Sequence, residues 1–130
     1  MKTAVRYYSR SGNTQALARA VARGAGAEAV PVDREDAPLR EPVDLLFVGG
    51  ALYAYGLDGR LKSYLKDLDG QLVKRAAVFS TSWISRHSVD LIRKALSEKG
   101  IPVEERVCYV KNRPTPAQEA EAEAWAKSLL

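Results

Sequence analysis

The 130-residue sequence has few of the residues on which disulfide, metal and acid-base chemistry depend. It contains one cysteine, Cys108, and one histidine, His87, so it can form neither an internal disulfide nor a CxxC metal or redox pair. We interpret Cys108 as a small core residue and His87 as a surface or helix-capping residue. No nucleophile with a base beside it can be assembled, so we expect no catalytic residue and no metal site.

Long apolar segments and concentrated charge are also missing. No stretch approaches the roughly 20 consecutive apolar residues of a membrane span, and the N-terminus lacks the apolar stretch of a secretory signal. We therefore expect a cytoplasmic protein without a membrane span. The formal net charge is +4, but the basic residues are dispersed along the chain, so we expect no nucleic-acid partner.

The residues that are present suit one folded domain over residues 1–130. Apolar residues make up 46% of the chain, which is enough for a proper core at this length. We find no internal repeat and no low-complexity tract. The Pro-rich and charged stretch at 33–42 is short enough to be a connection.

Hydrophobic periodicity predicts strands alternating with helices along the whole chain. The expected strands are 3–8, 27–32, 43–50, 75–82 and 101–110, and the expected helices are 13–24, 57–68, 87–99 and 116–130. This alternation favours a parallel sheet with helices on both faces. Open sheets of this kind bind ligands beyond the carboxyl ends of their strands.

Two details of the predicted core follow from single residues. Arg6 interrupts an otherwise apolar strand, and a buried unpaired charge is costly, so we expect its guanidinium to reach a carboxylate or the surface. In the last helix, Trp125 and Leu129 should face the sheet.

The segment "YYSRSGNTQALA" at 7–18 lies at the turn between the first strand and the first helix. Gly12 permits close backbone approach, the first-turn amides are unpaired donors, and Ser9, Ser11 and Thr14 carry hydroxyls. These are the parts of a phosphate-binding loop. The same residues also suit a plain helix start capped by Ser11 or Asn13, so the sequence leaves both interpretations open.

Three segments in order resemble the flavodoxin family. "YYSRSGNT" is similar to its phosphate-binding loop, "VGGALYAYG" to the first loop flanking the flavin ring, and "FSTSW" to the second. The C-terminal "NRPTPAQEAEAEAW" resembles its closing segment, so the likeness covers essentially the whole chain. The resemblance implies a three-layer α/β/α sandwich with a five-stranded parallel sheet in the order 2-1-3-4-5.

The resemblance also implies FMN as the cofactor and assigns residues to it. By this resemblance, the phosphate is bound by the loop residues Ser9, Arg10, Ser11, Gly12, Asn13 and Thr14. The flavin ring is bound between two later loops. The first is formed by Ala51, Leu52, Tyr53, Ala54, Tyr55 and Gly56, and the second by Ser80, Thr81, Ser82 and Trp83. Tyr53 or Tyr55 on one side and Trp83 on the other are the expected stacking partners, because aromatic faces cover a flavin well.

The family's role implies an electron carrier that works between a reductase and an acceptor. The alternative is an FMN-dependent oxidoreductase, such as a quinone reductase or a protoporphyrinogen oxidase of the flavodoxin-like type, and a flavin-free binding module is a third reading. Basic residues in or near the expected loops, namely Arg10, Arg60, Arg86 and His87, predict a positive rim. We therefore expect redox protein partners with an acidic docking surface.

Overall fold

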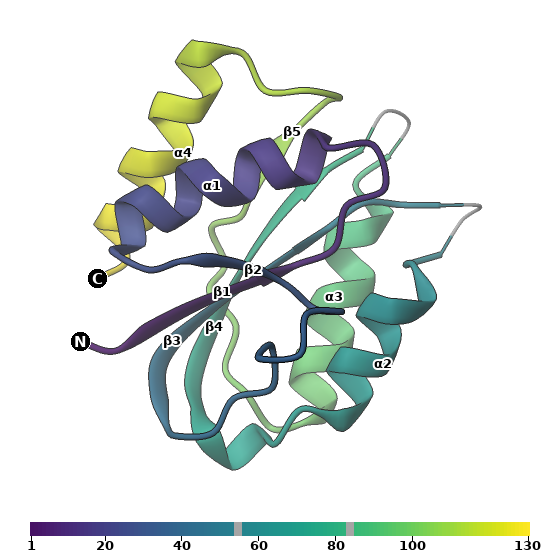
Figure 1. Ribbon diagram of the computed structural model, residues 1–130, viewed down its shortest axis with the longest axis vertical. Helices are drawn as coiled ribbons and strands as arrows, with labels where there is room; N and C mark the ends of the chain where they lie inside the picture. The colour runs from purple at the N-terminus through teal and green to yellow at the C-terminus, as the bar shows by residue number, and fades with distance from the viewer. Residues whose placement is uncertain (54–55, 83–84) are drawn as a thin grey trace.

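The sheet is fully parallel and its strand order is β2-β1-β3-β4-β5 (Figure 1). The structure is a computed structural model that describes residues 1–53, 56–82 and 85–130. The strands are β1 (Thr3–Tyr7), β2 (Ala29–Pro31), β3 (Val43–Gly50), β4 (Val73–Thr81) and β5 (Cys108–Val110). The helices are α1 (Asn13–Ala25), α2 (Gly59–Asp67), α3 (His87–Glu98) and α4 (Pro116–Ser128), and a 3₁₀ turn, η1 (Gly70–Leu72), precedes β4. The predicted order and fold class are therefore confirmed.

Helices α1 and α4 cover one face of the sheet, and α2 and α3 cover the other (Figure 1). Side chains of the central strand β3 alternate between the two layers, because successive residues of a strand point to opposite faces. Leu45 and Phe47 join the α1/α4 core, while Leu46 and Val48 join the α2/α3 core. All four are fully buried, which explains the nearly continuous apolar run in this segment.

The α1/α4 layer is closely packed. A Cβ atom at Gly24 would lie 2.2 Å from the Glu123 carbonyl oxygen and 2.9 Å from the Ala126 Cβ, so a glycine is needed where the two helices cross. Trp125 packs edge-on against Phe47 with ring centroids 5.5 Å apart. Trp125 and Leu129 both face the sheet, as predicted.

Several element boundaries differ from the expected ones. Helix α1 continues past Gly24 and ends at Ala25, where Gly26 adopts a left-handed φ of 68°. The expected fifth strand is mostly irregular: an isolated parallel bridge joins Val103 to Ala76, and regular pairing resumes only at β5. The charged stretch between these two points leaves the sheet, and there Arg75 on β4 pairs with Glu104 at 2.7 Å.

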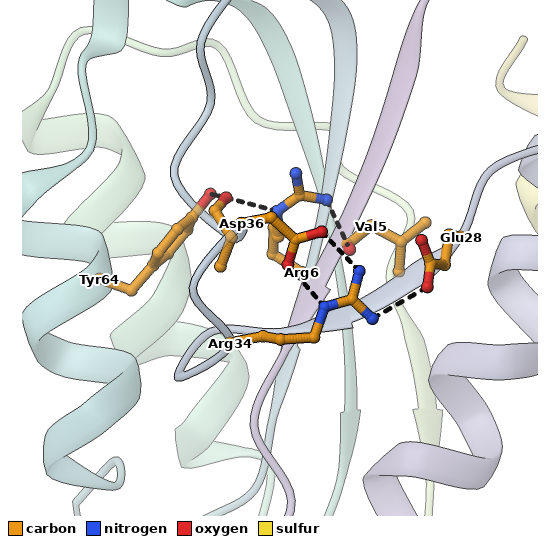
Figure 2. Close-up of polar contacts among 7 residues, drawn as sticks. Val5, Arg6, Glu28, Arg34, Asp36 and Tyr64 are labelled. Carbon is orange, nitrogen blue, oxygen red and sulfur yellow. Dashed lines mark hydrogen bonds and ion pairs between the residues drawn. The ribbon is translucent and has the colours of Figure 1, made fainter.

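Arg6 on β1 is half-buried, and its guanidinium, which was expected to reach a carboxylate or the surface, donates to backbone carbonyls (Figure 2). Its Nε donates to the Ala37 carbonyl at 2.7 Å and its Nη1 to the Val5 carbonyl at 3.1 Å. The nearby carboxylates of Glu28 and Asp36 bind Arg34 instead. The 33–42 connection thus folds back over β1 and brings a carbonyl within reach of Arg6.

Cys108 is half-buried on β5. Burial, and secondly the nearby Glu121 carboxylate, raise the pKa of its thiol to about 11, so the thiol stays protonated at neutral pH. Within the described ranges, no helix has the length and apolar composition needed to cross a bilayer.

Candidate functional site

The carboxyl ends of β1, β3 and β4 bring the three predicted loop segments to one edge of the sheet. The Tyr8 amide after β1 donates to the Gly49 carbonyl of β3 at 3.3 Å. The Ser80 hydroxyl of β4 bonds to the Gly50 carbonyl of β3 at 2.6 Å. These bonds hold the starts of the loops beside one another.

The loop between β1 and α1 has a backbone suited to an anion. Gly12 is the N-cap of α1 with a left-handed φ of 91°, and a Cβ added there would meet nothing within 4 Å. A left-handed backbone is the reason for a glycine at this position. The N-cap position is therefore taken by a residue without a side chain, and neither Ser11 nor Asn13 occupies it.

Backbone amides of the same loop lie at the N-terminus of the 13-residue helix α1, which is the positive end of its dipole. The Gly12 amide donates to Ser9 Oγ at 3.0 Å, and the Asn13 amide has a long contact of 3.4 Å with Ser11 Oγ. Among the described residues, none accepts a hydrogen bond from the amides of Ser11, Thr14 and Gln15. Free amides around a left-handed glycine at a helix N-terminus are a suitable cradle for a phosphate.

Thr14 connects this loop to the end of β4. Its Oγ1 lies 2.6 Å from Thr81 Oγ1, and both residues are buried. Thr14 was predicted as a phosphate ligand and Thr81 as a residue of the second ring-flanking loop. Their bond fixes the distance between the phosphate loop and that second loop.

The hydroxyls at the end of β4 point in different directions. Ser80 is fully buried and its Oγ bonds to Ser88 Oγ of α3 at 2.6 Å, so its side chain faces the core. The carbonyl of Ser82 accepts from the Tyr109 hydroxyl at 2.8 Å, which ties the second loop to β5. Trp83, the predicted stacking residue of this loop, lies outside the described residues.

The first ring-flanking loop closes on itself. The Tyr53 amide donates to the Gly56 carbonyl at 2.7 Å, and the Gly56 amide donates back to the Tyr53 carbonyl at 2.9 Å. Ala51 and Leu52 lead into this pairing and are half-buried. The predicted residues Ala54 and Tyr55 lie outside the described residues.

Tyr53 contacts the phosphate loop through both its hydroxyl and its ring. The hydroxyl accepts from the Arg10 amide at 3.0 Å, although Arg10 was predicted to bind the phosphate. The Arg10 guanidinium carbon lies 4.1 Å from the centroid of the Tyr53 ring, which is cation–π geometry. Arg10 therefore covers the residue that was expected to stack on the flavin.

Asp58 is a site residue that the sequence analysis missed. Its buried carboxylate accepts from Arg10 Nε at 2.8 Å and from the Arg60 amide at 2.8 Å, and it caps α2. Burial acts to raise the pKa of this carboxyl, but the Arg60 amide and the Arg10 guanidinium outweigh it, and the pKa lies below its ordinary value. The sequence analysis placed Asp58 inside the helix expected over 57–68, whereas α2 begins at Gly59; an aspartate near the start of a helical pattern is a common N-cap and was the available signal.

The predicted positive rim is partly neutralised by this carboxylate. Arg10 forms an ion pair with Asp58 at 2.8 Å, and Arg60 Nη1 lies 3.8 Å from it. The guanidinium of Arg86 lies over the Tyr109 ring, 5.2 Å from its centroid, and His87 is exposed at the start of α3. The four basic residues thus do not act as four free charges.

A large cavity of about 770 Å³ lies between the 32–39 segment and α2. Of the predicted phosphate loop it contacts only Arg10, and Asp58 and Arg60 lie on its wall. It is therefore separate from the cradle formed by the free amides. In the described ranges, no group of histidine, cysteine, aspartate and glutamate side chains is arranged to hold a metal ion.

Comparisons with known proteins agree with the observed fold. No curated protein sequence matches the chain. A flavodoxin from the domain Archaea has a similar structure, with a TM-score of 0.86 and 22% identity over 99% of this chain and 96% of that one. Oxidised flavodoxin 1 from Bacillus cereus has a TM-score of 0.79 and 19% identity over 97% of this chain and 95% of its own.

The same fold also occurs as part of a larger protein. Rubredoxin oxygen:oxidoreductase from Desulfovibrio gigas has a TM-score of 0.80 and 19% identity over 97% of this chain but only 34% of its own. The sequence profile of the flavodoxin domain matches residues 4–110, which include the predicted phosphate loop and both predicted ring-flanking loops. With this match over most of its length, the chain belongs to the flavodoxin family.

Proposed function

We propose that the protein binds FMN and transfers electrons between a reductase and an acceptor. The observation that carries the proposal is the cradle at the start of α1, where the left-handed Gly12 is followed by a helix start and the amides of Ser11, Thr14 and Gln15 have no acceptor among the described residues. When bound, FMN supplies one- and two-electron transfer. The chemistry then belongs to the cofactor, and the chain's residues bind and orient it.

Different loops would bind the phosphate and the ring of FMN. The phosphate loop, with Ser9, Ser11 and the free amides, would hold the phosphate, and the positive end of the α1 dipole favours its charge. The two ring-flanking loops lie at the ends of β3 and β4 and would hold the ring between them. The bond between Thr14 and Thr81 supports this arrangement, because it fixes one ring-flanking loop relative to the phosphate loop.

Arg10 would contribute charge near the ring. Its guanidinium lies on the Tyr53 ring, so a flavin stacked on the other face of Tyr53 would have a cation close behind that ring. A nearby cation favours a negatively charged reduced cofactor. The ion pair with Asp58 weakens this effect and also keeps the guanidinium in place.

A titration with FMN and with riboflavin, which lacks the phosphate, tests the proposal. We expect the protein to bind FMN at least about tenfold more tightly than riboflavin, since about 1.4 kcal/mol from the phosphate suffices for that factor. Ser11→Ala should reduce the preference without changing the affinity for riboflavin. Equal affinity for the two ligands, or no binding of either, would contradict the proposal.

A turnover assay distinguishes a carrier from an enzyme. Purified FMN-loaded protein should oxidise or reduce quinones and porphyrinogens no faster than free FMN does. Rapid saturable turnover of either class would favour the FMN-dependent oxidoreductase instead.

A further inference from the structure

A second concave surface lies between α2 and α3, away from the cradle. This α2–α3 groove has a volume of about 360 Å³. It is lined by Leu57, Lys62, Leu65, Lys66, Leu91, Lys94, Ala95, Glu98 and Lys99. Leu57, Leu65, Leu91 and Ala95 form an apolar floor, and four lysines with one glutamate form the rim.

The spacing of the lining residues shows that one face of α2 and one face of α3 form the two walls of the groove. Lys62, Leu65 and Lys66 follow one another at three- and four-residue spacing on α2, which puts them on one face. Residues 91, 94, 95 and 98 do the same on α3. The Lys99 ammonium closes one end by donating to the Lys66 carbonyl at the end of α2.

The charge on the rim is not balanced by the chain itself. Lys62, Lys66 and Lys94 are exposed, and within the described ranges none of them forms an ion pair. Elsewhere on the surface, several basic residues have a carboxylate partner; these are Lys2, Arg23, Arg34, Lys74 and Arg75. Unpaired lysines around an apolar floor are complementary to a ligand with acidic flanks and apolar anchors.

The open end of the groove adjoins the first ring-flanking loop. Leu57 directly follows Gly56, and a Cβ atom at Gly56 would lie 3.6 Å from Lys62 Nζ. A protein seated in the groove would therefore touch the loop beside the proposed flavin. This position is suited to a macromolecule that exchanges electrons with the cofactor.

We propose that the α2–α3 groove is the docking site for an acidic amphipathic helix of a redox partner protein. Apolar side chains of that helix lie on Leu57, Leu65, Leu91 and Ala95, and its carboxylates meet Lys62, Lys66 and Lys94. Helix-in-groove recognition of this kind places anchors at three- and four-residue spacing. The redox role of the partner rests on the proposed function, whereas the binding surface does not.

A synthetic peptide tests the surface directly. The probe is a helical peptide with leucines at three- and four-residue spacing and glutamates on both flanks. Titrated into the isotope-labelled full chain at low salt, it should shift backbone amide resonances of α2 and α3 near the groove. A second peptide with lysines in place of the glutamates should bind at least about tenfold more weakly, a difference of about 1.4 kcal/mol.

Matched variants separate a specific site from general attraction by a basic protein. Lys62→Glu with Lys94→Glu should weaken binding of the acidic peptide at least about tenfold. Arg19→Glu with Lys127→Glu changes the net charge equally, but on α1 and α4, and should weaken it less than twofold. Ala95→Gln, which fills the floor with a polar side chain and changes no charge, should also weaken binding.

Three results would overturn the proposal. They are resonance shifts that lie outside the groove, equal weakening by the two charge-reversed pairs, and equal binding of the acidic and basic peptides. The titration is run with and without added FMN. Failure to bind FMN refutes the proposed function while the peptide still reports on the groove, so the two failures are distinguishable.

Discussion

Helices α1 and α4 pack against each other through small residues, whereas α2 and α3 leave a groove between them. On the first side, Gly24 allows backbone contact with Glu123, and Trp125 fills the space above Phe47. On the second side, lysines surround an apolar floor. The same sheet therefore carries one layer closed by packing and one layer with a surface open to a partner.

The difference has a physical cause in side-chain size. Small residues let helices approach until their backbones touch, and such contacts tolerate no added volume. Long lysine side chains cover apolar surface with their stems but keep their ammonium groups in water, so they hold no tight interface. The closed layer should therefore respond to mutation through stability, and the open layer through binding.

The largest effect should come from the centre of the closed layer. Trp125→Ala should reduce the free energy of unfolding by about 3–5 kcal/mol, because it removes a large buried ring and its contact with Phe47. Urea denaturation measures the change. Trp125→Phe keeps an aromatic ring and should cost clearly less. A similar loss in both variants would contradict this role of aromatic packing, since the indole Nε1 has no hydrogen-bond partner among the described residues.

A smaller effect is expected where α1 meets α4. Gly24→Ala should destabilise the protein by about 1–3 kcal/mol, because the new Cβ would lie 2.2 Å from the Glu123 carbonyl oxygen. This should outweigh the gain in helix propensity. Gly59→Ala at the start of α2 is the matched control, since a Cβ there meets nothing within 4 Å. A neutral Gly24→Ala in urea denaturation would show that the layer is less rigid than described.

The link between the phosphate loop and β4 should affect both stability and binding. Thr14→Val should lower the free energy of unfolding by about 1–3 kcal/mol, because it leaves the buried Thr81 hydroxyl without its partner. It should also weaken FMN binding. The exposed Ser11 has no such buried partner, so Ser11→Ala should lower FMN affinity alone. Urea denaturation and FMN titration separate the two effects; unchanged stability in Thr14→Val would contradict this role of Thr14.

The smallest effect should be the pH dependence of the stabilisation that Asp58 gives as the N-cap of α2, a helix of the open layer. The pKa of this carboxyl is lowered in the folded state, so its stabilisation is present above its ordinary pKa of about 3.9. That stabilisation is lost as the pH falls through the folded-state value. The stability difference between wild type and Asp58→Asn should thus be constant near neutral pH and shrink below about pH 4. Denaturation curves at several pH values measure it, and a constant difference would exclude a role for the ionised form.

Most helices and strands were predicted from sequence patterns, because the spacing of apolar residues within a segment depends on that segment's own secondary structure. Apolar runs such as 43–50 and helical spacing such as that around Val89, Ile92 and Leu96 predict their elements directly. A fifth strand was predicted over 101–110, but its shortness was not, because the residues before Cys108 pair only at Val103 and then follow the charged stretch outward. A strand boundary depends on its neighbour in the sheet, and one segment's sequence does not contain that neighbour.

In the candidate site, too, local features were predicted from the sequence and contacts between distant residues were not. The sequence by itself determined the turn between β1 and α1 and the amides at the start of the helix, because a glycine followed by a helix start is a local motif. Only the tertiary structure decided that Thr14 bonds to Thr81, that Arg10 covers Tyr53, and that the buried Asp58 holds Arg10 in place. These contacts join residues more than 40 positions apart, and no local pattern encodes the partner of a charge or a hydroxyl. The α2–α3 groove likewise exists only because two helices pack side by side and leave their lysines at its rim.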